Sequence, residues 1–269
     1  MKIIRPRPSE TSGLVLLEGE ERNGVILSGK AVSPVSNETY EIRNGYLDLL
    51  GRRSGADNFA NLTNFLPGAG RAYEPLWRVR SLDLLTGTRF PNDREVEIIS
   101  ELANVERGGL FLDLGCSAGL YTRSVASALG DSGDVVGIDI SPSMLKEAAR
   151  RAGNLGVSPS FARADAKNLP FADASFSGAL CGGSLNEFGD PARVLRETRR
   201  ILRPGGRLAI MGILRASNGT GLRLQRLLST GGARFFGRDE LRSMFSHSGF
   251  EAEEMRTFGA VFFISAARR

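Results

Sequence analysis

The spacing of apolar and polar residues changes twice along the chain. Up to about residue 50, short alternating apolar stretches are separated by Gly, Asn and Pro, a pattern typical of short strands. The Asn44-Gly45 pair lies between two of these stretches and predicts a tight hairpin. We therefore expect residues 1–50 to form a small β-rich unit.

The next segment, residues 51–91, has no regular period, although it holds many of the aromatic residues. We interpret it as a linker with irregular helices that cover the domain that follows. Its aromatic residues include Phe59, Phe65, Tyr73, Trp77 and Phe90.

A regular pattern begins at residue 92. Asn92 and Glu95 have the spacing of a capping box and predict the start of a helix. Seven apolar runs and four further helical periods follow. The predicted strands are 110–114, 135–139, 158–163, 177–181, 207–212, 251–257 and 261–266, and the predicted helices are 118–129, 143–154, 191–202 and 238–248.

Strands that alternate with helices of this length require a parallel sheet with crossovers on both faces. The last two strands are joined by only residues 258–260, so they must pair antiparallel. The pattern predicts an α/β domain over residues 92–269. Its sheet is doubly wound, seven-stranded and mostly parallel, ends in an antiparallel hairpin, and carries the N-terminal unit as an appendage.

Length and composition fit this picture. The 269 residues suffice for one large α/β domain with an appendage, and no apolar run reaches membrane length. The N-terminus lacks the apolar middle section of a secretory signal, so we expect a cytoplasmic protein without a membrane span.

The formal net charge of +5 admits nucleic acid or acidic substrates. The basic residues are nevertheless mostly arginines scattered along the chain, which is more typical of a solvated surface than of a binding stripe. The cysteines Cys116 and Cys181, even with the single His247, fall one ligand short of a structural zinc site. We expect no metal, and in a reducing cytoplasm no disulfide.

The segment DLGCSAG (residues 113–119) follows the first strand of the regular region and precedes a helix. Asp113 ends the strand, and Gly115 and Gly119 allow the backbone to approach a ligand closely. Their Gly-x-x-x-Gly spacing differs from the dinucleotide fingerprint, and Ser117 stands where a further glycine is common. Taken alone, the motif is equally compatible with an ordinary strand-to-helix turn.

Two further acids follow strands of the same predicted sheet. Asp139 closes the second strand, where a carboxylate can accept hydrogen bonds from both hydroxyls of a ribose. The alternative role, capping the next helix, can be filled by Ser141 instead. Asp165 follows the third strand and could accept from an adenine amine, or it could be a surface acid.

Together, the segments DLGCSAG, VVGIDISPSML, RADAKNLPFADASF and RRILRPGGRLAIMG resemble the class I S-adenosylmethionine-dependent methyltransferases. The likeness is strongest to the type 11 branch, which contains the ubiquinone/menaquinone C-methyltransferases, and it covers about residues 92–269. It implies a Rossmann-like fold and S-adenosyl-L-methionine as cofactor. The implied contacts are Asp113, Gly115, Cys116, Ser117 and Gly119 at the methionine end, Asp139 at the ribose, Ile140 and Met144 beside the adenine, Asp165 and Ala166 at the adenine edge, and Cys181 and Gly182 against the sulfonium.

One departure from the family concerns the general base. Many relatives carry histidines after the fourth strand, whereas this chain has CGGSLNEFGD there, so a histidine base cannot be assigned. Glu187 and Tyr73 are the candidate catalytic residues, and the alternatives are an exposed acid and a packing aromatic.

The substrate region is expected between residues 213 and 237. Phe235 and Phe236 lie between glycines, which suggests a mobile apolar lid or else a surface loop anchored by two rings. With Trp77 and Asn186 they are our candidate substrate residues. We expect a small, apolar or aromatic methyl acceptor.

Two other functions stay open. Residues 29–50 resemble the end of the zinc-ribbon module that precedes some ribosomal RNA methyltransferases, but no cysteine remains there, so the metal would be lost. That likeness and the positive charge leave an RNA methyltransferase as an alternative. A non-catalytic cofactor-binding or scaffold protein with the same fold is the other. The acceptor atom and the oligomeric state are not predicted.

Overall fold

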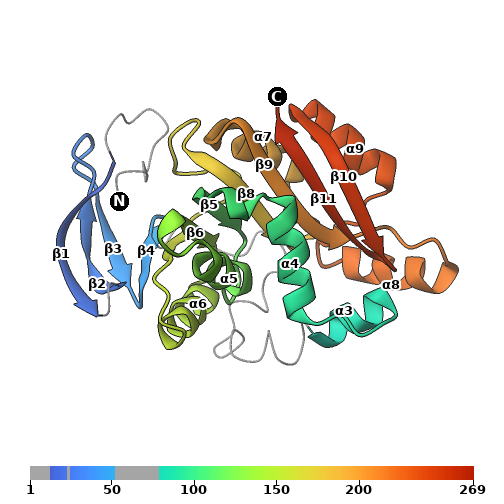
Figure 1. Ribbon diagram of the computed structural model, residues 1–269, viewed down its shortest axis with the longest axis horizontal. Helices are drawn as coiled ribbons and strands as arrows, with labels where there is room; N and C mark the ends of the chain where they lie inside the picture. Colours follow the sequence, from blue (N-terminus) through green and yellow to red (C-terminus); the bar gives the residue numbers. More distant parts are fainter. Residues whose placement is uncertain (1–12, 23–24, 52–78) are drawn as a thin grey trace.

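The computed structural model describes residues 13–22, 25–51 and 79–269, in which eleven strands form a single sheet (Figure 1). The strands are β1 (Val15–Arg22), β2 (Val25–Val32), β3 (Thr39–Arg43), β4 (Tyr46–Asp48), β5 (Gly109–Leu114), β6 (Gly133–Asp139), β7 (Ser160–Arg163), β8 (Phe176–Gly182), β9 (Leu202–Ile213), β10 (Phe250–Phe258) and β11 (Val261–Arg268). The helices are α3 (Val79–Thr86), α4 (Asn92–Leu102), α5 (Leu120–Leu129), α6 (Pro142–Asn154), α7 (Pro191–Ile201), α8 (Gly219–Ser229) and α9 (Arg238–His247). The short 3-10 helices are η4 (Val105–Arg107), η5 (Gly130–Ser132) and η6 (Ser184–Asn186).

The sheet order is β1-β2-β3-β4-β7-β6-β5-β8-β9-β11-β10. From β7 to β9 the neighbouring strands are parallel, and β11 lies antiparallel between β9 and β10. The predicted seven-stranded, doubly wound sheet with a terminal hairpin is therefore confirmed. The hairpin turn is short because only Gly259 and Ala260 separate β10 from β11.

The N-terminal strands extend this sheet. β4 pairs in parallel with β7 through Leu47 opposite Ala162 and Asp48 opposite Arg163. Figure 1 shows the β1–β3 strands at the end of the molecule opposite to β10 and β11. The division into units at residues 50 and 91 stays a prediction, because the sheet runs past the first boundary and residues 52–78 lie outside the described part.

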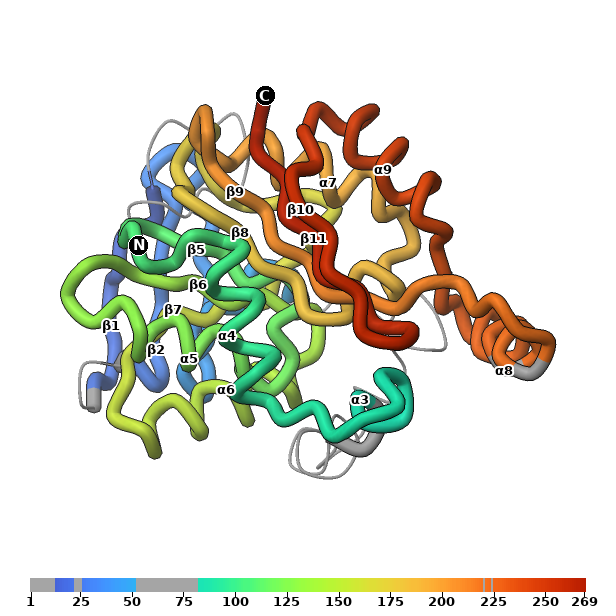
Figure 2. The backbone as a smooth tube through the Cα atoms, turned by 45° about the vertical axis from the view of Figure 1, so that its right-hand side comes forward, coloured from blue at the N-terminus to red at the C-terminus, as the bar shows by residue number. Residues whose placement is uncertain are grey.

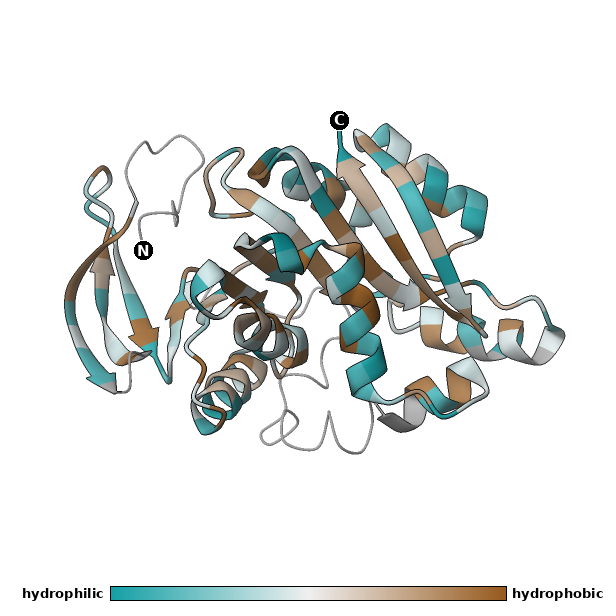
Figure 3. Ribbon diagram, viewed as in Figure 1, coloured by the Kyte–Doolittle hydropathy of each residue, from teal (hydrophilic) through white to brown (hydrophobic). Residues whose placement is uncertain are grey.

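Both faces of the central strands are covered by helices, which explains their continuous apolar sequences. Leu208 and Ile210 of β9 pack in the core with α7 and α9, whereas Ala209 and Met211 pack on the opposite face with α3, α4 and α5. The hydropathy colours of Figure 3 show brown along these strands and teal on the outward turns of the helices. The sheet thus presents its strand ends, and not its faces, to a ligand.

The local signals can now be compared with the structure. The predicted hairpin at Asn44-Gly45 is confirmed, and both residues have positive φ, at 50° and 82°. The predicted cap at Asn92 is wrong. Pro91 is the last extended residue, so the helix begins at Asn92 itself, and the Glu95 side chain is buried against the Tyr121 hydroxyl instead of closing a capping box.

The segment after β9, where no helix was predicted, contains the helix α8, which begins after the side-chain cap of Asn218. None of the helices in the described ranges is long and apolar enough to cross a membrane.

Candidate active site

The carboxyl ends of β5, β6, β7 and β8 meet at one edge of the sheet, and the loop after β5 is bent sharply toward β6. Gly115, Ser117 and Gly119 all have positive φ, at 65°, 50° and 78°. This bend lets the Cys116 amide donate to the Ile138 carbonyl at 2.8 Å. The glycine-rich loop is therefore attached to the strand that carries Asp139.

The glycines of this loop are required by close packing as well as by their backbone angles. A Cβ at Gly115 would lie 2.7 Å from Cβ of Ser184 in η6, and a Cβ at Gly119 would lie 2.9 Å from Cβ of Ala148 in α6. The Ser184 hydroxyl also donates to the Gly115 carbonyl at 3.1 Å. Gly115 thus sets how closely the loop after β5 approaches the loop after β8, and Gly119 sets how closely it approaches α6.

Asp139 is held by backbone amides from both sides. One carboxylate oxygen accepts from the Ser117 amide at 2.9 Å, and the other accepts from the Ser141 amide at 2.8 Å. Burial raises the pKa of Asp139, and the amides of Ser141, Ser117 and Ile140 oppose that shift. A carboxylate has about four acceptor sites, so acceptor capacity remains for a ribose hydroxyl. The geometry therefore fits the role predicted for Asp139.

The residues expected around an adenine lie next to it. Met144 is buried in α6, and its sulfur accepts from the Ser117 hydroxyl at 3.5 Å. The Ala164 amide donates to the Asp139 carbonyl at 3.2 Å, which places the β7 end beside the β6 end. Asp165 follows, with 36% of its side chain exposed and one oxygen accepting from the Lys167 amide at 2.8 Å. Ile140 is half-buried and Ala166 is buried.

Two residues predicted at the methionine end, Asp113 and Cys116, and Cys181, predicted against the sulfonium, point inward. The buried Asp113 carboxylate accepts from the Thr122 hydroxyl of α5 at 2.6 Å. Burial raises the pKa of the Cys116 thiol well above its usual value and that of the Cys181 thiol to about 12, so both are protonated. Cys181 is fully buried, so at this site it can act only through its backbone and its shape. Gly182 beside it is half-buried.

Glu187 is the titratable residue whose environment fits a general base. It follows η6 and is half-buried. Burial raises its pKa to about 7, and the negative charge of Asp139 adds to the shift. The electrostatic interaction with Asp139 places Glu187 near the acid that the sequence predicts to bind a ribose. The other candidates, Tyr73 and Trp77, lie outside the described residues.

The candidate substrate residues differ in their accessibility. The Asn186 amide is buried, accepts from the Ile213 amide at 2.8 Å and donates to the Arg234 carbonyl at 2.6 Å, so it joins the β9 end to the loop before α9. Phe236 is 1% exposed in the core and its backbone bridges Leu214, so it is no mobile lid. Of the two rings, only the half-buried Phe235 is left to meet a ligand.

The sequence reading missed a buried ion pair behind the site. The guanidinium of Arg163, at the end of β7, lies 3.3 Å from both Asp48 carboxylate oxygens, and its Nε donates to the Ile140 carbonyl at 3.0 Å. The same guanidinium donates to the Gly51 carbonyl at 2.6 Å. The available signal was a charged residue in each of two apolar strands, Asp48 in β4 and Arg163 in β7.

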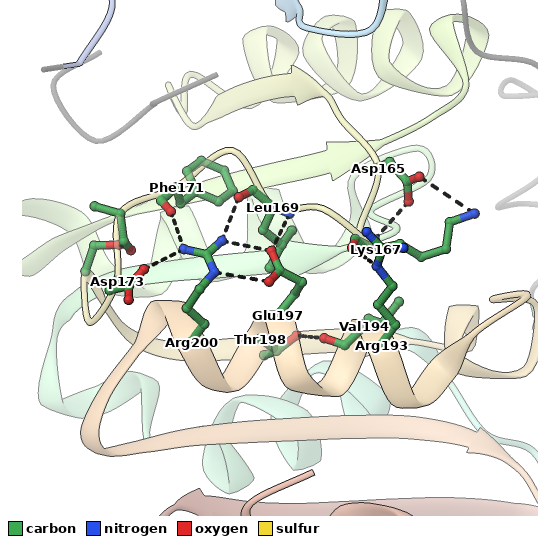
Figure 4. A network of polar contacts seen from close by, with 12 residues as sticks. Asp165, Lys167, Leu169, Phe171, Asp173, Arg193, Val194, Glu197, Thr198 and Arg200 are labelled. Carbon is green, nitrogen blue, oxygen red and sulfur yellow. Dashed lines mark hydrogen bonds and ion pairs between the residues drawn. The ribbon is translucent and has the colours of Figure 1, made fainter. Parts of the chain in front are cut away.

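The loop after β7 is fixed to α7 by a second network, shown in Figure 4. Glu197 accepts from the Leu169 amide at 2.9 Å, and Arg200 donates to the carbonyls of Leu169 and Phe171 at 2.8 and 2.7 Å. Arg193 donates to the Lys167 carbonyl at 2.8 Å. The backbone that carries Asp165 is therefore held in place from both α7 and β6.

Comparison with known proteins gives a consistent result. Residues 112–210 match the family model described as "Methyltransferase domain". The chain is 37% identical over 120 residues to the ubiquinone/menaquinone biosynthesis C-methyltransferase UbiE of Pseudomonas savastanoi, covering 44% of this chain and 47% of that protein. It is 30% identical over 164 residues to the demethylmenaquinone methyltransferase of Desulfitobacterium hafniense, covering 59% and 61%.

Among solved structures, the geranyl diphosphate C-methyltransferase of Streptomyces coelicolor superposes with a TM-score of 0.58 at 14% identity, covering 66% of this chain and 76% of that one. This likeness shows the shared fold. The chain spans about half the length of the curated relatives it matches.

Proposed function

We propose that this chain, whose residues 112–210 form a methyltransferase domain, transfers a methyl group from S-adenosylmethionine to a small apolar molecule. The observation that carries the proposal is Asp139, an acid at the end of β6 whose two oxygens are oriented by backbone amides. The adjoining left-handed loop at 115–119 supports it.

S-adenosylmethionine, when bound, supplies an electrophilic methyl group on a sulfonium. Asp139 would bind the ribose hydroxyls, Met144 and Ile140 would flank the base, and Asp165 would accept from the adenine amine. The loop at 115–119 would receive the methionine end. Transfer itself mainly requires the acceptor in line with the methyl group in a water-poor site.

Glu187 is our proposed base for an acceptor that must lose a proton. With a pKa of about 7, it is partly ionised at neutral pH and can take up the proton as the bond to the methyl group forms. Because it is near Asp139 and stands on the loop after β8, it lies on the side of the site where the reactive end of the cofactor is expected.

The proposed acceptor is small and apolar. The curated relatives named above carry ubiquinone, menaquinone or demethylmenaquinone in their names, and the half-buried Phe235 provides an aromatic surface. The RNA alternative is less well supported, because several arginines are occupied in ion pairs, such as Arg150 with Glu147 and Arg256 with Glu101.

Calorimetry with S-adenosylmethionine tests the proposal. We expect binding by the wild-type chain and an affinity at least about tenfold weaker in Asp139→Ala, because a hydrogen-bonded charged contact contributes above about 1.4 kcal/mol. Asp134→Ala is the matched control, since this exposed acid stands at the other end of the same strand. The proposal fails if the wild-type chain does not bind, and the ribose assignment fails if both variants bind alike.

A further inference from the structure

The helix α8 and its flanks carry basic and apolar residues without any acid. Residues 213–237 contain four arginines, Arg215, Arg223, Arg226 and Arg234, and no Asp or Glu. Figure 2 shows α8 standing out from the body of the molecule beyond β9 and β11. The helix is attached on its inner side by Gln225, which accepts from the Ala216 amide and donates to the Leu214 carbonyl, both at 2.8 Å.

The outer surface of α8 exposes large apolar side chains. Leu227 is 67% exposed, Leu228 49% and Leu222 39%. Arg223 and Arg226 are exposed on the same helix, and Leu222 and Arg226 also line a groove of about 200 Å³ with Phe235 and Arg215. Exposed leucines beside arginines on a helix anchored along its opposite side are typical of helices that lie in a membrane interface.

We propose that α8 docks on the surface of an anionic phospholipid bilayer, with Leu227 and Leu228 entering the acyl boundary and Arg223 and Arg226 meeting lipid phosphates. Charge complementarity favours this occupant, because α8 itself carries Arg223 and Arg226 and no acid, while Leu227 and Leu228 project from it. The apolar acceptor proposed above would be found in the same bilayer, but the docking surface does not depend on that function.

Sedimentation of the full chain with vesicles tests this surface. We expect binding to vesicles of equal parts phosphatidylglycerol and phosphatidylcholine at least about tenfold stronger than to phosphatidylcholine alone, and weakened by salt. Leu227→Gln with Leu228→Gln should reduce the partition coefficient about tenfold, and Arg223→Gln about fivefold.

Matched controls separate docking through α8 from nonspecific adsorption to the vesicles. Leu155→Gln changes a leucine that is 64% exposed after α6, away from α8, and it should bind as the wild type does. Thermal melting identifies any variant that has lost its fold. If the double variant at Leu227 and Leu228 has done so, Leu228→Gln alone takes its place in the assay.

Three results would overturn the proposal: no binding to the anionic vesicles, equal losses in the α8 and control variants, or displacement of the chain from vesicles by a single-stranded RNA that it binds more tightly. Because the assay needs neither cofactor nor acceptor, its failure is distinct from failure of methyl transfer.

Discussion

At the scale of single residues, the proposed chemistry depends on how the surroundings change the hydrogen bonds and pKa values of ordinary side chains. Asp139 is one carboxylate among many in the sequence, but the amides of Ser117 and Ser141 orient both of its oxygens. Glu187, already a candidate from its sequence position, has a pKa suited to a base because burial and the charge of Asp139 raise it. The chemistry therefore belongs to the positions of these residues rather than to their types.

Replacement of Glu187 by Gln gives a test that depends on pH. The folded pKa of about 7 lies above the usual 4.5, so Glu187 contributes stability below pH 4.5 and loses it as the pH rises through 7. We expect Glu187→Gln to abolish this loss and to be more stable than wild type by up to about 3 kcal/mol at pH 8.

The same variant should also lose the rise of kcat with pH near 7, because Gln cannot take up a proton. Urea unfolding and a pH–rate profile measure the two effects. A profile that keeps its rise near pH 7 in the variant would exclude Glu187 as the base.

A second residue-level prediction concerns Gly115. Alanine there would have to adopt φ of 65° and would approach Ser184, so we expect Gly115→Ala to destabilise the fold by about 2–4 kcal/mol and to weaken cofactor binding. Gly153→Ala is the control, because Gly153 lies in α6 with open space around it. The Gly153→Ala change should raise the free energy of unfolding by about 0.5–1 kcal/mol. Similar melting temperatures for both variants would refute the packing argument.

At the scale of elements, the N-terminal strands contact the proposed cofactor site from behind. The buried pair of Asp48 in β4 and Arg163 in β7 leads directly to the carbonyl of Ile140, the residue after Asp139, our proposed ribose ligand. Removal of one partner leaves a buried charge, which typically costs about 3–5 kcal/mol. We therefore propose Asp48 and Arg163 as positioning residues.

We expect Asp48→Asn to lower the free energy of unfolding by several kcal/mol and to weaken binding of S-adenosylmethionine in the variant that remains folded. Glu18→Gln is the matched control, since Glu18 of β1 pairs with Lys30 of β2 at the exposed surface of the same sheet and such pairs contribute about 0–1 kcal/mol. An unchanged cofactor affinity in folded Asp48→Asn would show that the pair is only structural.

The elements themselves were largely predictable. Each strand of the central sheet and the Asn44-Gly45 hairpin follow from local periodicity and turn chemistry, which act over a few residues. The helix α8 was not predicted because Gly219 and Gly221 lie in its first turn and Gly231 and Gly232 follow it, and clustered glycines are typical of loops. The Asn92 cap was wrong by one residue because Pro91 takes the cap position.

At the scale of the whole molecule, ligand binding should stabilise the entire sheet. The proposed cofactor site lies where the loops after β5, β6, β7 and β8 meet, so opening any of these strands should disrupt it. At a cofactor concentration of about 100 Kd, we expect a stabilisation of about 2.7 kcal/mol and a rise of the melting temperature by about 5–10 °C. Differential scanning calorimetry measures this rise, and Asp139→Ala should lose most of it. An equal rise of the melting temperature in the wild type and in Asp139→Ala would show that the ligand binds elsewhere.

The sequence by itself determined the doubly wound sheet, its terminal hairpin and the candidate cofactor acids, because strand ends, caps and glycine turns are encoded within short segments. Only the tertiary structure decided that Glu187 lies near Asp139, that Phe236 is core, that Asn186 joins two loops, and that Arg163 joins the N-terminal strands to Ile140. These depend on contacts between residues far apart in the chain, and burial and electrostatic coupling exist only once the fold has brought them together.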